Sequence, residues 1–211
     1  MEITGLSKKG KYQIRVEIDG SYAFFLYGKD IKKLKIKEGD QINEQLIEDI
    51  YQLLLYPRAR EKALSLLQYR ARTTFEMRRK LMEIGYPAKI TDQVMDFLED
   101  YHYLDDRAYA RSYIEIQGKN KGPKRLRQEL ANKGIDREVF SSIWEGLDED
   151  QEEVSLEDLM KKKIKDPADL TRENYNKYAA FFLRKGFSPA LVHKKLKACF
   201  DGADEESYSD F

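Results

Sequence analysis

The sequence has few of the residues that form cross-links, metal sites and membrane spans. Its one cysteine, Cys199, excludes an intrachain disulfide and suits a reducing cytosol. The two histidines, His102 and His193, have no metal-ligand spacing with that cysteine, and no glycine-rich phosphate loop is present. The longest apolar runs, such as residues 179–183, fall far short of the ~20 residues needed to cross a bilayer, and the N-terminus lacks the apolar core of a signal peptide. We therefore expect a cytoplasmic protein with no cofactor, no metal, no membrane contact and no catalytic residues.

Charge is abundant but unevenly distributed. Charged residues make up 36% of the chain, above the usual ~25%, while an aromatic share of 12% argues against disorder. The net charge is zero, yet residues 58–134 hold 17 basic and 11 acidic residues, whereas residues 135–211 hold 12 and 18. This imbalance indicates that the middle of the chain faces a polyanion or an acidic partner. Solvation of helix faces is the alternative for any single run of charge.

The N-terminal segment has the pattern of a β-hairpin. Apolar and polar residues alternate from Tyr12 to Ile18, the period of a half-buried strand. Asp19-Gly20 favours a type I′ turn, and residues 22–26 supply the return strand. Residues 34–42 are expected to form a further short strand and turn, which completes a small β subdomain. A helix is then expected from Asn43, as its N-cap, to Pro57, which should end it.

The remainder of the chain is helical and repeats around three glycines. Gly85, Gly134 and Gly186 each follow a large apolar residue by four positions, and their separations are 49 and 52 residues. A period near ~50 residues is typical of stacked helical arrays, and glycine can take the left-handed conformation that ends a helix. The helices that follow should begin with the caps Thr91-Asp92, Asp136 and Ser188-Pro189. Cys199 is expected on the apolar face of the last helix.

The sequence thus predicts a mainly α fold of three tandem three-helix repeats in an elongated curved array, with a small N-terminal β-hairpin subdomain. The predicted boundaries are 1–42 for the β subdomain, 43–57 for the connecting helix, 58–104, 105–150 and 151–200 for the repeats, and 201–211 for a disordered acidic tail.

Three stretches resemble the RecX family of bacterial recombinase regulators. They are "ALSLLQYRARTTFEMRRKL", "GYPAKITDQVMDFLEDYHYLDDRAYARSYI" and "KGPKRLRQELANKGI". The resemblance covers about residues 58–200 and implies three tandem three-helix repeats. It also implies a non-enzymatic protein that binds the RecA recombinase and its DNA filament. Inhibition of filament extension, ATP hydrolysis, strand exchange and coprotease activity would follow.

Two stretches, residues 70–80 and residues 124–133, carry many cations. In residues 124–133, Leu126 and Leu130 point one way, so the basic residues should face solvent. Stacked repeats would align such faces into a basic stripe that contacts DNA phosphates or an acidic protein surface. The candidate partner- or DNA-binding residues are Arg70, Arg72, Arg78, Arg79, Arg111, Lys119, Lys121, Lys124, Arg125 and Arg127.

Aromatic residues and alternative functions complete the expectations. Tyr109 and Trp144 are expected in the core, whereas Tyr69, beside Arg70, is the best candidate for a base-stacking residue. Besides a monomeric regulator of a recombinase filament, two functions stay open. One is a nucleic-acid-binding module that contacts single- or double-stranded DNA through the backbone, and the other is a scaffold for a different acidic partner.

Overall fold

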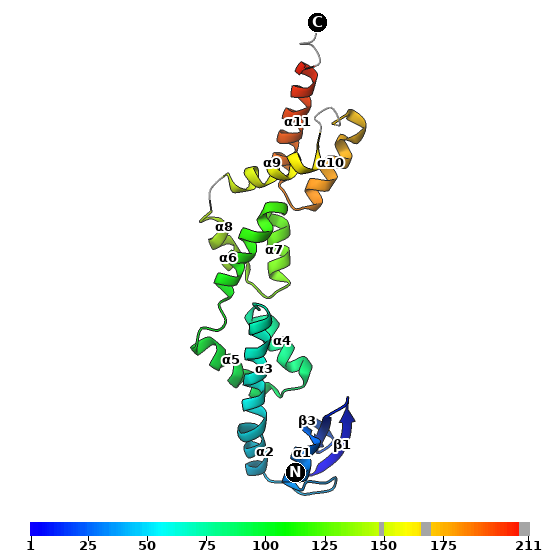
Figure 1. The fold of residues 1–211 in the computed structure, drawn as a ribbon, viewed down its shortest axis with the longest axis vertical. Helices are drawn as coiled ribbons and strands as arrows, with labels where there is room; N and C mark the ends of the chain where they lie inside the picture. The colour runs from blue at the N-terminus through cyan, green and yellow to red at the C-terminus, as the bar shows by residue number, and fades with distance from the viewer. Residues whose placement is uncertain (148–149, 166–169, 207–211) are drawn as a thin grey trace. The chain divides into compact units, whose positions relative to one another are not determined.

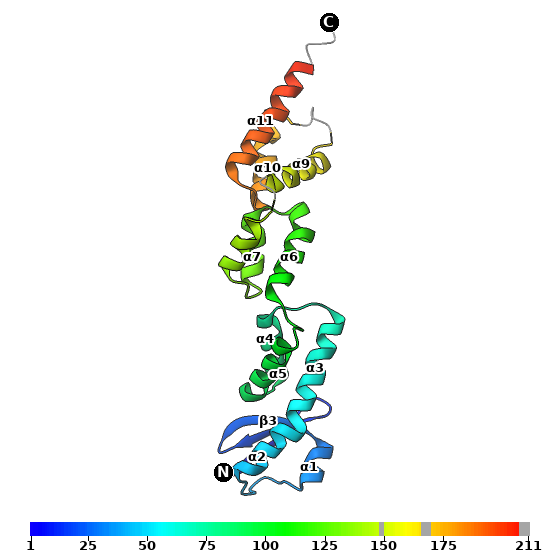
Figure 2. The ribbon, with the colours of Figure 1, turned by 90° about the vertical axis from the view of Figure 1, so that its left-hand side faces the viewer.

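The computed structural model describes residues 1–147, 150–165 and 170–206. The chain divides into two compact units, which we call unit 1 (Met1–Asp105) and unit 2 (Asp106–Phe211). Figure 1 shows the order of the elements along the chain, and Figure 2 shows them turned by 90°. The fold is mainly α with one small antiparallel sheet, as the sequence predicted.

Unit 1 contains the sheet and the first helices. Its elements are β1 (Ile3–Lys9), β2 (Gln13–Ile18), β3 (Ser21–Tyr27), α1 (Gly28–Leu34), α2 (Glu44–Ile50), the π-helical turn η1 (Tyr51–Leu55), α3 (Tyr56–Tyr69), α4 (Thr74–Ile84) and α5 (Ala88–Asp100). Unit 2 contains helices in its described part. They are α6 (Asp106–Gln117), the 3₁₀ turn η2 (Gly118–Asn120), α7 (Pro123–Ala131), α8 (Arg137–Trp144), α9 (Gln151–Lys163), α10 (Arg172–Arg184) and α11 (Pro189–Glu206).

The predicted hairpin is confirmed, but it is two strands of a three-stranded sheet. β2 and β3 are antiparallel, and Asp19 and Gly20 have φ values of 49° and 76°, which a type I′ turn requires. β1, which the sequence analysis missed, pairs with the other side of β2. The strand expected over 34–42 is wrong: that segment begins at the end of α1 and forms an isolated bridge between Gln41 and Glu2 instead of a strand. Backbone hydrogen bonds between Ile3 and both Gly39 and Asp40 also join it to β1.

The sheet shares its core with the first helical repeat. Phe24, Phe25 and Leu26 of β3 are almost fully buried in one apolar cluster with residues of α3, α4 and α5, such as Ala59 and Leu81. The sheet and the first repeat are therefore packed around one apolar core rather than two. Figure 2 shows the sheet beside α2 and α3.

Pro57 does not end the connecting helix, contrary to prediction. The chain passes from α2 through the π turn η1 directly into α3, where Pro57 lies in the first turn. A π turn shifts the hydrogen-bond pattern by one residue, so the missing N–H of a proline in the next turn breaks less of the ladder. Asn43 caps α2 as predicted, because its side chain accepts a hydrogen bond of 2.8 Å from the Leu46 N–H.

All three repeat glycines end their helices as predicted. Gly85, Gly134 and Gly186 have φ values of 111°, 81° and 92°, a range that side chains disfavour. At each turn the N–H of the residue after glycine bonds back to a helix carbonyl, which is the Schellman arrangement. The donor–acceptor pairs are Tyr86 to Leu81, Ile135 to Leu130 and Phe187 to Phe182. Both residues of each pair are buried. Each of the three turns therefore combines a backbone hydrogen bond with the burial of two apolar side chains.

Three local expectations are wrong. Thr91 is not a cap, because α5 begins at Ala88 after Pro87 and Thr91 lies buried inside the helix. Cys199 is exposed, since Val192 and Leu196 occupy the core face of α11. Residues 201–206 continue α11 as a helix rather than a disordered tail, and residues 207–211 lie outside the described residues.

Unit 2 has two apolar clusters, one in each of its repeats. The first joins α6, α7 and α8 through residues such as Ile114, Leu126 and Ile143. Tyr109 and Trp144 pack against it while half-buried, in agreement with their expected place in the core. The second joins α9, α10 and α11. Within the described ranges, no helix combines the length and apolar character of a membrane span.

Candidate nucleic-acid and protein interface

The first two turns of α7 bring three cations to the surface. Leu126 and Leu130 are fully buried, so the helix can present only its opposite side to solvent. Lys124, Arg125 and Arg127 are exposed there, and we call these three residues the α7 basic face. Their exposure agrees with the sequence pattern, while their role in binding stays a prediction.

The start of α7 is fixed by the turn of the next repeat. The Gly122 N–H donates to the Lys185 carbonyl at 2.9 Å, and the Lys124 N–H donates to the Gly186 carbonyl at 3.2 Å. A Cβ on Gly122 would collide with the backbone of Gly186 and Phe187. Gly122 is therefore required for close approach rather than for its dihedral angles, since its φ is an ordinary −78°.

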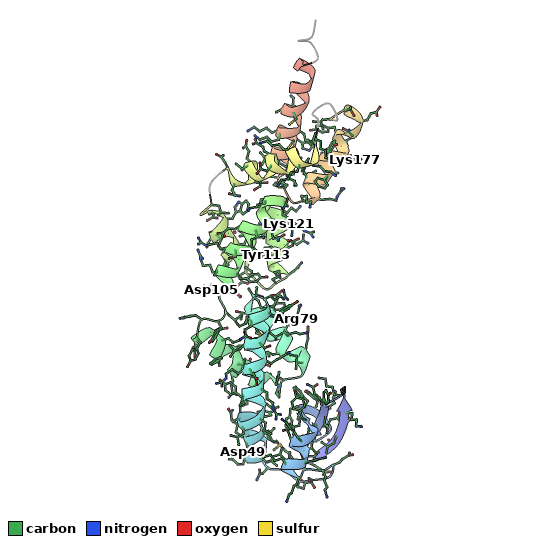
Figure 3. All side chains as sticks on the ribbon, in the orientation of Figure 1. Asp49, Arg79, Asp105, Tyr113, Lys121 and Lys177 are labelled. Carbon is green, nitrogen blue, oxygen red and sulfur yellow. The ribbon has the colours of Figure 1, made fainter. Side chains whose placement is uncertain are left out.

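Lys121, one of the predicted binding residues, is held in a half-buried hydrogen-bond network instead of facing solvent. Glu129 accepts hydrogen bonds from Lys121 at 2.6 Å, Tyr113 at 2.7 Å and Arg125 at 2.8 Å. Burial alone would raise the pKa of Glu129, but these hydrogen bonds lower it to about 2. Burial and the bond to Glu129 raise the pKa of the Tyr113 hydroxyl. Figure 3 labels Tyr113 and Lys121 in this region.

This network engages two residues of the predicted set. The Lys121 side chain is 22% exposed and is paired with Glu129 at 2.6 Å, so contact with a phosphate would require breaking this ion pair. Its role in binding stays a prediction. Arg125 keeps 49% of its side chain exposed and can turn from Glu129 toward a partner at small cost. The four-residue spacing of Arg125 and Glu129 on one helix would have indicated their pairing from sequence.

A hollow of about 350 Å³ lies where the second and third repeats meet within unit 2. Lys124 and Arg127 line it from α7, and Trp144 lines it from α8. The Trp144 ring stacks on Phe140, with ring centres 5.7 Å apart. We call this site the junction hollow. The junction hollow combines the cations Lys124 and Arg127 with the Trp144 ring. Such a combination suits a ligand that has a phosphate next to a planar group.

Arg111 on α6 and Lys119 in η2 are also exposed. Within the described part of unit 2, neither residue forms an ion pair, and the same holds for Lys124 and Arg127. These four side chains can therefore neutralise an external anion without first breaking an internal pair.

The predicted arginines of unit 1 come from the α3–α4 loop and from α4. Arg78 pairs with Asp92, and Arg79 lies 3.5 Å from Glu83. Arg70 lies 3.9 Å from Glu76. Such partly exposed pairs are weak, so these arginines remain available to a partner. Arg72 differs, since it is half-buried and its Nε has no hydrogen-bond partner in the described residues.

Exposed aromatic rings accompany these arginines. Tyr69, at the end of α3, is 85% exposed. Its exposure agrees with the prediction that it lies outside the core, while base stacking on it stays a prediction. Phe75 at the start of α4 is 45% exposed, with the Arg79 guanidinium 5.5 Å from the ring centre. The sequence analysis did not single out Phe75. Its position two residues after the capping residue Thr73, on the side opposite Met77, could have indicated exposure.

Eight of the ten predicted residues thus fall into separate local groups. Lys124 and Arg127 share the junction hollow, Lys121 and Arg125 share Glu129, and the four arginines of unit 1 lie in the α3–α4 loop and on α4. Arg111 on α6 and Lys119 in η2 belong to neither group of unit 2. The continuous basic stripe across repeats stays a prediction.

The arrangement defines a class of protein. It consists of helical repeats joined through glycine turns, with cationic groups on an exposed helix. In the described ranges, no three His, Cys, Asp or Glu side chains gather as metal ligands would. These features suit a protein that binds an anionic partner through its surface.

Comparisons with known proteins identify the family. Residues 59–98 match the model for the first three-helix domain of RecX, and residues 105–141 match the model for the second. The chain belongs to the RecX family of non-enzymatic regulatory proteins.

Similar relatives cover nearly the whole chain. The regulatory protein RecX of Clostridium botulinum strain Alaska E43 is 26% identical over 91% of this chain and 92% of its own length. That of Listeria monocytogenes serotype 4a is 29% identical over 92% of this chain and 71% of its own length. A crystal structure of a regulatory protein RecX superimposes with a TM-score of 0.63 at 25% identity, over 93% of this chain and 98% of that one.

Proposed function

We propose that this protein binds a RecA recombinase and its DNA filament in the cytoplasm, as a monomer. Binding would limit filament extension and thereby lower ATP hydrolysis, strand exchange and coprotease activity. The observation that carries the proposal is membership of the RecX family, through two matched domains. The recombinase is the partner that the sequence resemblance implies.

The α7 basic face supplies a physical basis for contact with the filament. Its exposed cations can displace counterions from DNA phosphates, which gives affinity without sequence preference. They can also meet acidic side chains of a protein. Because Lys124 and Arg127 flank the junction hollow, a ligand there would contact both charges together.

The double variant Lys124→Glu, Arg127→Glu tests the proposal. We expect it to fold normally, since both side chains are exposed and an acidic residue near a helix N-terminus is favourable. Inhibition of RecA ATPase on single-stranded DNA should require at least about tenfold more of this variant, the equivalent of ~1.4 kcal/mol.

The matched control is Lys194→Glu, Lys197→Glu on α11, which reverses two exposed cations at the same spacing. The control should inhibit like the unmodified protein. Failure of the unmodified protein to inhibit ATPase or strand exchange at stoichiometric amounts would refute the proposed function. Equal inhibition by both double variants would instead exclude the α7 basic face as the contact.

A second candidate function is a sequence-independent nucleic-acid-binding module, favoured by the same exposed cations. The two functions differ in their preferred target. A regulator should bind DNA loaded with recombinase more tightly than bare DNA at matched salt, whereas a simple module should not. For a simple module, binding to bare duplexes should be equal for different sequences and fall steeply with salt.

A further inference from the structure

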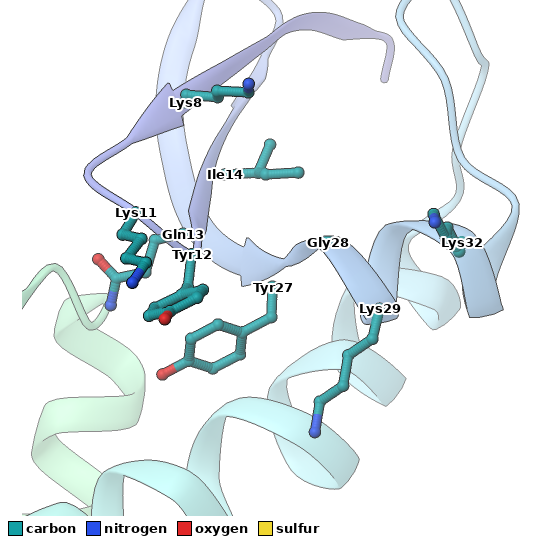
Figure 4. A pocket seen from close by; sticks show the side chains of 9 residues that line it. All are labelled: Lys8, Lys11, Tyr12, Gln13, Ile14, Tyr27, Gly28, Lys29 and Lys32. Atoms are coloured by element: carbon teal, nitrogen blue, oxygen red, sulfur yellow. The ribbon is translucent and has the colours of Figure 1, made fainter.

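The N-terminal sheet carries a second basic site, apart from the α7 basic face. A pocket of about 670 Å³ opens between the β1–β2 turn, the end of β3 and α1. Figure 4 shows four lysines and two tyrosines around it. They are Lys8, Lys11, Lys29, Lys32, Tyr12 and Tyr27. We call this site the N-terminal pocket.

The charge of this pocket is not compensated. Its lining contains no carboxylate, and its four lysines form no ion pair among the described residues. The one acidic residue of α1, Asp30, is buried and accepts two hydrogen bonds from Arg58, at 2.7 and 2.8 Å. Because these bonds engage both carboxylate oxygens, Asp30 forms no ion pair with Lys29 or Lys32, although its charge acts on Lys29 through space. Four like charges around one concavity repel each other unless an anion enters.

The tyrosines give the pocket flat apolar surfaces. Tyr12 is 67% exposed, and the Lys11 ammonium lies 5.1 Å from the centre of its ring. Tyr27 is held in place by Phe25, in an edge-on contact of 6.2 Å, and by the Arg58 guanidinium at 5.0 Å. Figure 4 shows both rings at the same end of the pocket. An exposed ring beside cations is the arrangement on which unpaired bases stack.

We propose that the N-terminal pocket binds a short segment of single-stranded nucleic acid, with phosphates on the lysines and a base stacked on Tyr12. Its volume falls within the ~300–1,000 Å³ of ordinary ligand pockets, enough for one or two nucleotides. An acidic peptide would use the lysines but would leave the tyrosine rings without a planar partner, so the rings favour nucleic acid. This site goes beyond the proposed function, because it requires neither a recombinase nor the α7 basic face.

A tryptophan placed in the pocket tests this directly. The chain has one tryptophan, so the full-length variant Tyr12→Trp, Trp144→Phe reports fluorescence from the pocket alone. Titration with a fifteen-residue oligothymidylate at low salt should quench this fluorescence to saturation, as base stacking does. Quenching should persist when Lys124→Glu and Arg127→Glu are added, which separates this site from the proposed function.

Neutralising the lysines supplies the second readout. Adding Lys8→Gln, Lys11→Gln, Lys29→Gln and Lys32→Gln should weaken the quenching. It should also lower the slope of log affinity against log salt by about 0.7–1.4, since each of the one or two phosphates in the pocket contributes about 0.7 on a single strand. The control is Lys161→Gln, Lys162→Gln, Lys194→Gln and Lys197→Gln, four exposed lysines of unit 2 that should change neither value.

Two results would overturn the proposal. One is the absence of quenching by the oligonucleotide, or quenching that the pocket lysines do not affect. The other is saturation by a deca-glutamate peptide at a lower concentration than the oligonucleotide, which would assign the pocket to an acidic protein. If the fourfold variant loses its far-ultraviolet dichroism, the pairs Lys8/Lys11 and Lys29/Lys32 are replaced separately.

Discussion

Replacing Gly122 by alanine should separate the second repeat from the third. The added Cβ would collide with the backbone of Gly186 and Phe187, which cannot move aside as a flexible side chain can. Relief of the collision requires the start of α7 to move away from the α10–α11 turn. That movement breaks the hydrogen bonds from Gly122 to Lys185 and from Lys124 to Gly186.

The cost follows from these two bonds. Each backbone hydrogen bond contributes about 0.5–1.5 kcal/mol net, so their loss costs about 1–3 kcal/mol. Alanine is also a poorer N-cap than glycine, which adds a few tenths, while the stiffer unfolded chain returns about 0.4–1 kcal/mol. We therefore expect Gly122→Ala to lower the free energy of unfolding of unit 2 by about 1–3 kcal/mol.

Denaturation followed by tryptophan fluorescence measures this effect locally. Trp144 is the single tryptophan and lines the junction hollow together with Gly186 and Phe187. In parallel, hydrogen exchange of the Gly122 and Lys124 amides should accelerate in the variant, because both lose their acceptors.

Gly146→Ala is the matched control in the same unit. A Cβ at Gly146 would lie 3.6 Å from the nearest carbonyl oxygens, an ordinary contact, and its φ is not left-handed. The control should be neutral, or more stable by up to about 1 kcal/mol. If Gly122→Ala unfolds at the same denaturant concentration as Gly146→Ala and its amides stay protected, the junction does not hold the repeats together as described.

Two further predictions concern the same unit. Gly134→Val should cost about 1–2 kcal/mol in chemical denaturation, because Gly134 has a φ of 81°, which a β-branched residue strongly disfavours; an unchanged midpoint would contradict the strain. Because the pKa of Glu129 is lowered to about 2, its stabilisation is present above its ordinary value of 4.5 and lost as the pH falls through about 2. The unmodified protein should thus lose about 2–3 kcal/mol between about pH 5 and pH 2 that Glu129→Gln does not lose, as denaturation at each pH would show; parallel losses in both proteins would count against the network.

The features that the sequence predicted correctly are those determined by neighbouring residues. A helix that ends at Gly85, Gly134 or Gly186 needs only the glycine and the apolar residue four positions before it. The Asp19-Gly20 turn needs only those two residues between two alternating runs. Local conformational preference and local burial agree at these positions, so the pattern can be recognised without knowing the rest of the fold.

The missed features depend on contacts between distant segments. β1 carries Gly5 and two lysines, so it has little strand pattern of its own, and it is stabilised by pairing with β2. Pro57 was assigned to a helix end because proline usually interrupts the ladder, but η1 and the shared core of unit 1 keep the helix continuous.

The candidate site shows the same division. The exposure of Lys124 and Arg127 followed from the narrow stripe of Leu126 and Leu130, which any amphipathic helix obeys. The pairing of Lys121 with Glu129 did not, since it depends on the path of the loop between η2 and α7. The junction hollow could not be predicted at all, because the Gly186 turn, which lines it together with α7 and α8, is more than fifty residues from α7 in the sequence.

The junction also determines how α7 can bind an anion. A helix N-terminus usually offers its free N–H groups to a phosphate. In α7 the Lys124 N–H is bonded to Gly186, the Gly122 N–H to Lys185, and Pro123 has none. Binding at this end of the helix must therefore depend on the side chains of Lys124 and Arg127 rather than on the backbone. It follows that neutral substitutions of these two residues together with the exposed Arg125 should remove the salt dependence contributed by α7, an effect that a backbone anion site would resist.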